Sequence, residues 1–410
     1  MMIKKNLRII LLGVVTLLSL YLYFLSVQIT KETIKCKTKM IDNLKEEKKA
    51  LIYLNQLRQG AGLIPFSLAE NLNQATKNHA NYLIENHTYG HIEESNKSKF
   101  TGKFASDRVV NEGYHTDLII ENVSSNNRNY KESIDGLFAA IYHRFAFLDF
   151  QGDEIGIAIK QNQYNPTETA FVYNIGSSTL NKLYETNKKP SQKELNIALD
   201  NYKDINSRVV TYPFDKQTDV PTVFFNELPD PLPKHDVSGF PISISFNQAY
   251  FKNIRLLKFE LFESNKTSIL NTLVYDNKTD PNGRLDKLSF ALFPLDRLEW
   301  NSEYIVKFLA VIDKQLVEKE WSFKTRNPLI PLHKVEDESK IFTVTVNKPN
   351  LFYFPPKTPK DLLKNIRYNQ YFDMEFVDKN TLKLTALKTS FIINHIKIGG
   401  HNLKLNIQNQ

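Results

Sequence analysis

The clearest helical pattern in the chain runs from Tyr130 to Phe145. Its apolar side chains recur in steps of three and one residues, at Ile134, Leu137, Phe138, Ile141, Tyr142 and Phe145. This spacing is typical of a helix that buries one face. We predict one such helix, with His143 about opposite Ile134 and turned away from the core. A histidine followed by Arg144 at a helix end is also a common solvated pair, so the pattern alone does not assign it a role.

Two further helices are predicted upstream. The first runs from about Leu44 to Gln59 and is stopped by Gly60. The second follows Ser67, which with Glu70 has the spacing of a capping box. His79 lies on its apolar face, and we expect a buried histidine with a satisfied hydrogen bond.

Residues 86–129 form a long connection with little periodicity, and connections of this length in compact domains are usually functional. Strands are predicted near Glu154–Lys160 and Thr169–Ile175. Helices that alternate with short strands indicate an α+β fold, compatible with a helix–sheet–helix sandwich.

The pattern changes after a polar linker. From Ile242 to Thr325, short alternating runs are separated by turn signals such as Asp280-Pro281-Asn282-Gly283. We predict an all-β, immunoglobulin-like sandwich. The tail continues with strands near Phe342–Val346 and Thr381–Leu384, and Asp361–Ile366 is predicted as a short helix.

The N-terminus carries an apolar run without charge, Ile9 to Val27, which is long enough to cross a bilayer. No small-residue cleavage site follows it, so we predict an uncleaved signal anchor. The single cysteine, Cys36, excludes an intramolecular disulfide. The net charge of +8 is spread along the chain rather than concentrated. This distribution favours general solubility and argues against nucleic-acid binding.

These observations divide the chain into six expected segments. They are a signal anchor (1–30), a stalk (31–43), an α+β domain (44–178), a linker (179–211), an Ig-like β-sandwich (212–326) and a small β-rich C-terminal region (327–410).

Several short motifs occur in a fixed order along the α+β domain. They are Asn55-Gln56-Leu57-Arg58, Gly90-His91, Glu121-Asn122-Val123, Tyr142-His143-Arg144 and Asp153-Glu154-Ile155-Gly156-Ile157. In this order they resemble the CAP superfamily, which comprises cysteine-rich secretory, antigen 5 and pathogenesis-related class 1 proteins. The likeness is closest to bacterial members and covers about residues 45–178. It implies an extracytoplasmic location in a bacterial cell envelope.

The resemblance also implies a cleft that brings two histidines and two acidic residues together. His91 matches the first histidine, Glu121 the acid of the Glu-Asn pair, and His143 the second histidine. Glu132 is the best candidate for the fourth position, although its local match is poor. Two neutral imidazoles suit zinc, so His91 and His143 are the candidate metal ligands and zinc the cofactor to consider.

Three functions remain open from the sequence. The first is a membrane-anchored extracytoplasmic protein whose His/Glu cleft binds a ligand or divalent metal. The second is an envelope hydrolase that uses the same cleft, since a histidine oriented by a carboxylate is a base near neutral pH. The third is an adhesin or scaffold that binds through the Ig-like region. The expected partners are the membrane and an envelope protein, lipid or glycan.

Overall fold

The computed structural model describes residues 39–200, 205–364, 366–367 and 371–409. The predicted signal anchor, most of the stalk and Cys36 lie outside these residues. Within the described part of the chain, no helix is both long and apolar enough to span a membrane. The chain forms two compact units, which meet in sequence at Asn327 and Pro328.

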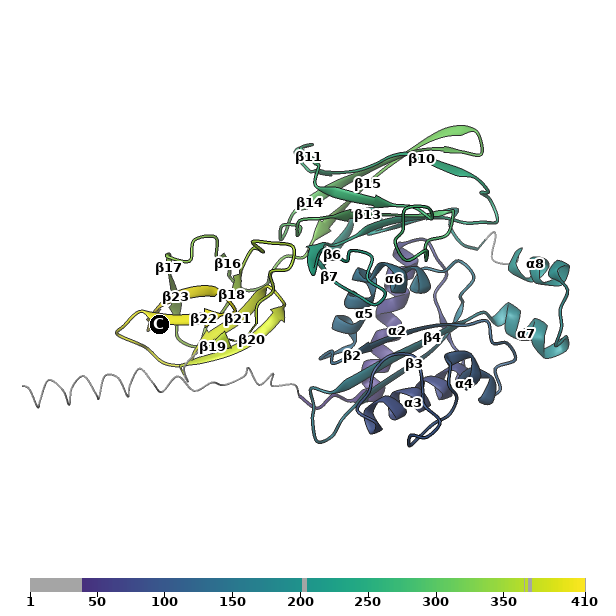
Figure 1. The fold of residues 1–410 in the computed structure, drawn as a ribbon, viewed down its shortest axis with the longest axis horizontal. Coiled ribbons are helices and arrows are strands. Elements are labelled where there is room, and N and C mark those ends of the chain that lie inside the picture. Colours follow the sequence, from purple (N-terminus) through teal and green to yellow (C-terminus); the bar gives the residue numbers. More distant parts are fainter. Residues whose placement is uncertain (1–38, 201–204, 365, 368–370, 410) are drawn as a thin grey trace, which may run out of the picture. The chain divides into compact units, whose positions relative to one another are not determined.

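The first unit begins with an N-terminal region in which helices cover both faces of a four-stranded sheet (Figure 1). The strand order is β1-β3-β4-β2. Its helices are α2 (Asn43–Gly60), α3 (Glu70–Glu85), α4 (Ala105–Asn111), α5 (Tyr130–Ala139), α6 (Ile141–Phe147), α7 (Ser178–Thr186) and α8 (Gln192–Asp200). Its strands are β1 (Ser67–Leu68), β2 (Ile120–Ser125), β3 (Glu154–Gln161) and β4 (Thr169–Gly176).

The alternation of side chains along β3 explains how both faces of this sheet are covered. Ile155, Ile157 and Ile159 belong to one apolar cluster with α2 and α5. Ala158, on the opposite face, packs in a second cluster with residues of α3. The helix–sheet–helix sandwich predicted from the sequence is therefore confirmed.

Two of the predicted helices differ from the structure, one at its start and one by a break in its interior. Ser67 lies in β1 rather than at a helix N-cap, and α3 begins at Glu70 without a side-chain cap. The helix predicted from Tyr130 to Phe145 is broken at Ala140, whose ψ of 108° is extended. The break separates α5 from α6, so His143 lies on a short helix of its own.

A β-sandwich region completes the first unit. One sheet has the order β11-β10-β14-β15-β6 and the other β12-β13-β9-β5. The strands of the first sheet are β6 (Gln217–Val220), β10 (Ile254–Glu263), β11 (Ser268–Ile269), β14 (Glu303–Ile312) and β15 (Gln315–Thr325). Those of the second are β5 (Val209–Tyr212), β9 (Ile242–Phe246), β12 (Thr272–Tyr275) and β13 (Ser289–Pro294), and β7 (Val223–Phe225) pairs separately with β8 (Val237–Gly239).

The β-sandwich region and the N-terminal region share one apolar core. Phe138 of α5 lies against Tyr212 of β5, with ring centroids 4.7 Å apart. At the surface, the Arg326 guanidinium bonds the Asp135 carboxylate of α5 at 2.7 Å and Asp219 of β6 at 2.8 Å. The two regions therefore pack against each other as one compact unit and are not independent domains joined only by a linker.

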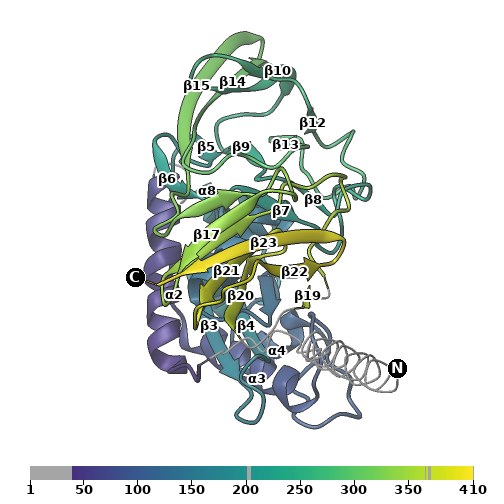
Figure 2. The ribbon, with the colours of Figure 1, turned by 90° about the vertical axis from the view of Figure 1, so that its left-hand side faces the viewer.

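The second unit consists of two further four-stranded sheets (Figure 2). One contains β16 (Leu332–Lys334), β18 (Pro349–Tyr353), β20 (Phe372–Asp378) and β21 (Thr381–Ala386). The other contains β17 (Ile341–Thr345), β19 (Ile366–Arg367), β22 (Asn394–Ile398) and β23 (His401–Gln408). The helix predicted at Asp361–Ile366 is wrong, because residues 361–364 are irregular and buried Leu363 contributes to the apolar core of this unit.

Candidate functional site

The first half of the candidate site is the pair formed by His91 and Glu121. His91 lies in the loop after α3 and is about half-exposed, whereas the Glu121 side chain of β2 is only 3% exposed. The ring Nδ1 lies 3.0 Å from Glu121 Oε1. Both oxygens of this carboxylate also accept hydrogen bonds from Arg108 Nη2, at 2.9 and 2.8 Å. Glu121 is thus fixed between a histidine and an arginine.

Charge around Glu121 decides its ionisation. Burial alone would raise the pKa of this carboxyl, but the hydrogen bond from His91 and the electrostatic interactions with His79 and Arg108 outweigh burial. The net result is a pKa below the usual range of glutamate. An ionised Glu121 accepts a hydrogen bond from Nδ1 of His91, and in the neutral imidazole the other ring nitrogen, Nε2, is then the acceptor.

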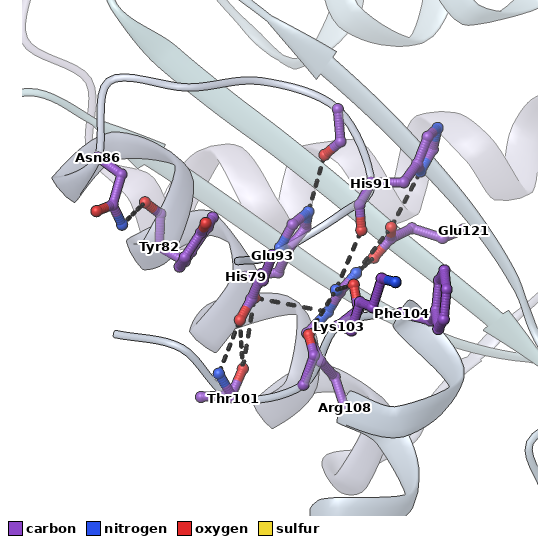
Figure 3. A network of polar contacts seen from close by, with 12 residues as sticks. His79, Tyr82, Asn86, His91, Glu93, Thr101, Lys103, Phe104, Arg108 and Glu121 are labelled. Atoms are coloured by element: carbon purple, nitrogen blue, oxygen red, sulfur yellow. Dashed lines mark hydrogen bonds and ion pairs between the residues drawn. The ribbon is translucent and has the colours of Figure 1, made fainter. Parts of the chain in front are cut away.

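A buried polar network supports this pair from below (Figure 3). His79 places Nδ1 2.9 Å from Glu93 Oε1 and Nε2 2.9 Å from the Gly90 carbonyl oxygen. Glu93 also accepts a hydrogen bond from the Thr101 backbone N–H at 2.7 Å. His79 is therefore the buried, hydrogen-bonded histidine that the sequence predicts.

Arg108 joins this network to the loop that carries His91. Its Nη1 donates to the carbonyl oxygens of His91 at 3.1 Å and Gly102 at 3.2 Å, and its Nε lies 3.7 Å from Glu93. The buried Arg108 guanidinium thus has an opposite charge on both sides, since it lies between two buried carboxylates. The network holds the long connection, and with it His91, in one conformation.

The second half of the site is His143 on α6. Asn122, next to Glu121 on β2, donates from Nδ2 to the His143 carbonyl oxygen at 2.9 Å. The Glu-Asn pair therefore holds both histidines, one through its ring and the other through its backbone. The two imidazole rings lie nearly parallel, at 18°, with centroids 6.5 Å apart.

The partner of the His143 ring comes from the β-sandwich region. Its Nδ1 lies 2.9 Å from Oε2 of Glu227, in the segment between β7 and β8. Burial raises the pKa of Glu227 above the usual glutamate range, although hydrogen bonding and charge from His143 and the charge of Arg144 oppose this rise. Sequence reasoning missed Glu227, since the residue lies 84 positions after His143 in a stretch without a recognisable motif.

The structure does not bring Glu132 to the histidines. This residue lies in the first turn of α5, and its carboxylate accepts hydrogen bonds from the backbone N–H and Nε of Arg128, at 2.7 and 3.0 Å. It thus joins the start of the helix to the preceding loop. The carboxylate that does face the His143 ring is that of Glu227.

The ring nitrogens of His91 and His143 can be compared with the ligands that a protein-bound metal ion requires. Histidines that bind metals commonly donate their other ring N–H to a carboxylate, as both rings do here. Among the described residues, neither ring Nε2 has a hydrogen-bond partner. Catalytic zinc usually has three protein ligands. The described residues contain no group of three or more His, Cys, Asp or Glu side chains placed to hold a metal. The two histidines therefore offer a metal at most two ligands from the described residues, so a bound metal would need water or a further ligand to complete its coordination.

Fold and site together define an α+β domain in which two neighbouring histidines each face a glutamate, followed by a β-rich region. Comparison with protein families adds that residues 51–175 match the model described as the Cysteine-rich secretory protein family, CAP. This match covers the sheet, the cleft histidines and Glu121, but ends before Glu227. We call residues 51–175 the CAP domain below.

Two solved structures illustrate the similarity. An outer surface protein from Borrelia burgdorferi is 20% identical over 34% of this chain and 98% of its own, with a TM-score of 0.30. An extracellular protein containing a SCP domain from Bacillus anthracis is 15% identical over 36% of this chain and 45% of its own, with a TM-score of 0.29. A comparison with curated protein sequences finds no match.

Proposed function

We propose that this chain is a membrane-anchored extracytoplasmic protein whose cleft binds a divalent metal, zinc being the best candidate, or a small ligand between His91 and His143. One observation carries the proposal. Both rings turn Nδ1 to a buried carboxylate and leave Nε2 without a partner within the described residues. Two oriented imidazole lone pairs in one cleft are suited to a shared ligand.

Calorimetric titration of the full-length chain in detergent with zinc tests this proposal. The parent should bind, and His91→Ala and His143→Ala should each lose most of the affinity. His87→Ala is the matched control, because His87 is exposed and pairs with Glu168 rather than with a cleft residue. Equal affinity in the parent and both cleft variants would refute a shared site.

An envelope hydrolase is the second candidate. It is supported by the His91–Glu121 pair, in which an ionised carboxylate orients a histidine whose Nε2 can accept a proton. Turnover of an envelope peptide, lipid or glycan should then be abolished in Glu121→Gln while zinc binding is only weakened. A variant with unchanged turnover would remove this candidate.

The anchor and location rest on the uncharged run from Ile9 to Val27 and on the match to a family described as secretory. Protease treatment of intact cells checks both. The CAP domain should be cut only when protease reaches the outer side of the membrane. Release of the whole chain into the soluble fraction without detergent would contradict an uncleaved anchor.

A further inference from the structure

We infer that Glu227 is the second carboxylate of the cleft, supplied by the β-sandwich region, and that it positions His143 as Glu121 positions His91. The CAP domain alone would then contain only half of the paired arrangement. This makes the β-sandwich region a part of the site rather than a spacer.

The first argument is the contact itself. Both oxygens of the Glu227 carboxylate are used on α6, because Oε2 faces Nδ1 of His143 at 2.9 Å and Oε1 accepts the Ile141 backbone N–H at 2.8 Å. The Ile141 amide belongs to the first turn, where a helix provides no backbone acceptor of its own. Two simultaneous bonds fix the carboxylate, and the carboxylate in turn fixes the plane of the ring.

Burial strengthens this constraint. The Glu227 side chain is 5% exposed and that of His143 is 16% exposed. A buried carboxylate without a hydrogen-bond donor is costly, so the segment after β7 has little freedom to withdraw from α6. Glu121 is equally buried on the other side of the cleft, at 3%. The site thus has two buried carboxylates, each behind one imidazole.

The residues on either side of His143 provide the second argument. The Tyr142 hydroxyl bonds Asp280 and accepts a hydrogen bond from Asn282 Nδ2 at 3.0 Å. Arg144, fully buried, donates to Ser243 Oγ at 3.1 Å and lies over the Phe240 ring. Three consecutive residues of α6 are therefore each held by a different part of the β-sandwich region.

The broken helix explains why such support is needed. Because Ala140 has an extended ψ and the Ile141 N–H bonds Glu227, the orientation of α6 does not follow from that of α5. Short helices are marginal without tertiary contacts. The contacts through Glu227, Asp280 and Ser243 supply an orientation that the CAP-domain sequence alone does not.

The decisive variant is Glu227→Gln, which keeps the shape of the side chain and removes its charge. The tautomer of His143 can be read from the ring nitrogen resonances of a full-length chain labelled with ¹⁵N in histidine. The parent should show a proton on Nδ1 of His143, and the variant should lose this preference while His91 keeps its own signals. Unchanged His143 signals in the variant would overturn the inference.

Glu132→Gln is the matched control, because it alters a carboxylate of the same domain that contacts Arg128 instead of a histidine. It should leave both histidines unchanged. Tyr142→Phe disturbs the same interface without touching Glu227, and it too should preserve the His143 tautomer. A loss of that tautomer in Tyr142→Phe equal to the loss in Glu227→Gln would show a general structural effect and overturn the positioning role.

Zinc affinity is the second readout, and it alone rests on the proposed function. Loss of a carboxylate behind a metal-binding histidine commonly lowers affinity about 10- to 100-fold, so Glu227→Gln should fall in this range and Glu132→Gln should match the parent. If the parent binds no zinc, the proposed metal function fails, while the tautomer measurement still decides the role of Glu227.

Should Glu227→Gln not fold, Glu227→Asp replaces it, since its shorter side chain cannot reach Nδ1 and the Ile141 amide together. A folded Glu227→Asp with unaltered His143 signals would then overturn the inference.

Discussion

The imidazole rings of His91 and His143 lie nearly parallel, at 18°, with centroids 6.5 Å apart. They come from a loop and a short helix separated by β2, yet one dipeptide on that strand, Glu121-Asn122, contacts both residues. If both rings bind one ligand, this proximity makes their contributions to the binding free energy interdependent.

A double-mutant cycle tests that interdependence. If one ligand bridges the rings, His91→Ala and His143→Ala should each remove most of the zinc affinity, and the double variant should lose little more. Calorimetry on all four proteins gives the coupling free energy. Strictly additive losses would instead indicate two independent sites.

Arg108 should be important for stability. Arg108→Met keeps most of the side-chain volume but leaves the buried Glu93 and Glu121 carboxylates without their shared cation. Breaking a buried ion pair in this way costs about 3–5 kcal/mol of unfolding free energy. Arg128→Met, at a partly exposed pair with Glu132, should cost less than about 1 kcal/mol. Denaturant titration compares the two, and equal losses would contradict the role assigned to the buried network.

Close packing of α3 on the sheet depends on Gly156. A Cβ at this position of β3 would overlap the backbone C and O atoms of Leu72. Gly156→Ala must therefore push α3 away from the sheet, and we expect a marked fall in the thermal midpoint or no folded protein. Gly136→Ala is the control, because a Cβ there meets nothing within 4 Å and alanine favours the helix by up to about 1 kcal/mol. A well-folded Gly156→Ala of parental stability would refute this packing argument.

Acid should weaken the second unit through Glu338. Partial burial pushes the pKa of this carboxyl up, but hydrogen bonds from Lys357 and Asn402 outweigh burial and bring it to about 2. A folded-state pKa below the unfolded value means that the ionised form stabilises the fold. This contribution is present above about pH 4.5 and is lost as the pH falls towards 2.

Thermal unfolding at pH 6 and pH 3 measures this effect. The parent should lose more stability between the two values than Glu338→Gln does, because the variant has no proton to take up at that position. An identical acid dependence in both proteins would show that other carboxylates, such as Asp361, account for the whole effect.

Local patterns were sufficient to predict much of the fold. The boundaries of α2, β3 and β4 follow from amphipathic periodicity and glycine stops, and these elements agree with the structure within a few residues. The break at Ala140 could not be predicted, because the apolar pattern continues across it and neither glycine nor proline marks it. Tertiary contacts to the β-sandwich region, rather than local propensity, determine where α6 points.

The site residues, like the helices, could be predicted from the sequence only where a local motif marks them. His91, Glu121 and His143 were located through motifs whose order resembles a family, and the structure places them close together. Glu132 was the best candidate for the fourth position that the resemblance implies, although its local match is poor and about three helical turns would separate it from His143. Glu227 carries no comparable local signal, and its contact with His143 arises only when the two regions pack together.

The ion pair between Arg326 and Asp135 affects how the first unit resists a pull on the chain. Arg326 is the point at which the chain leaves the β-sandwich region, and Asp135 lies on α5, the helix that leads directly into α6. Tension on the polypeptide beyond Asn327 would therefore be resisted by this ion pair, which ties the end of the β-sandwich region to α5 independently of the covalent connection through residues 179–211.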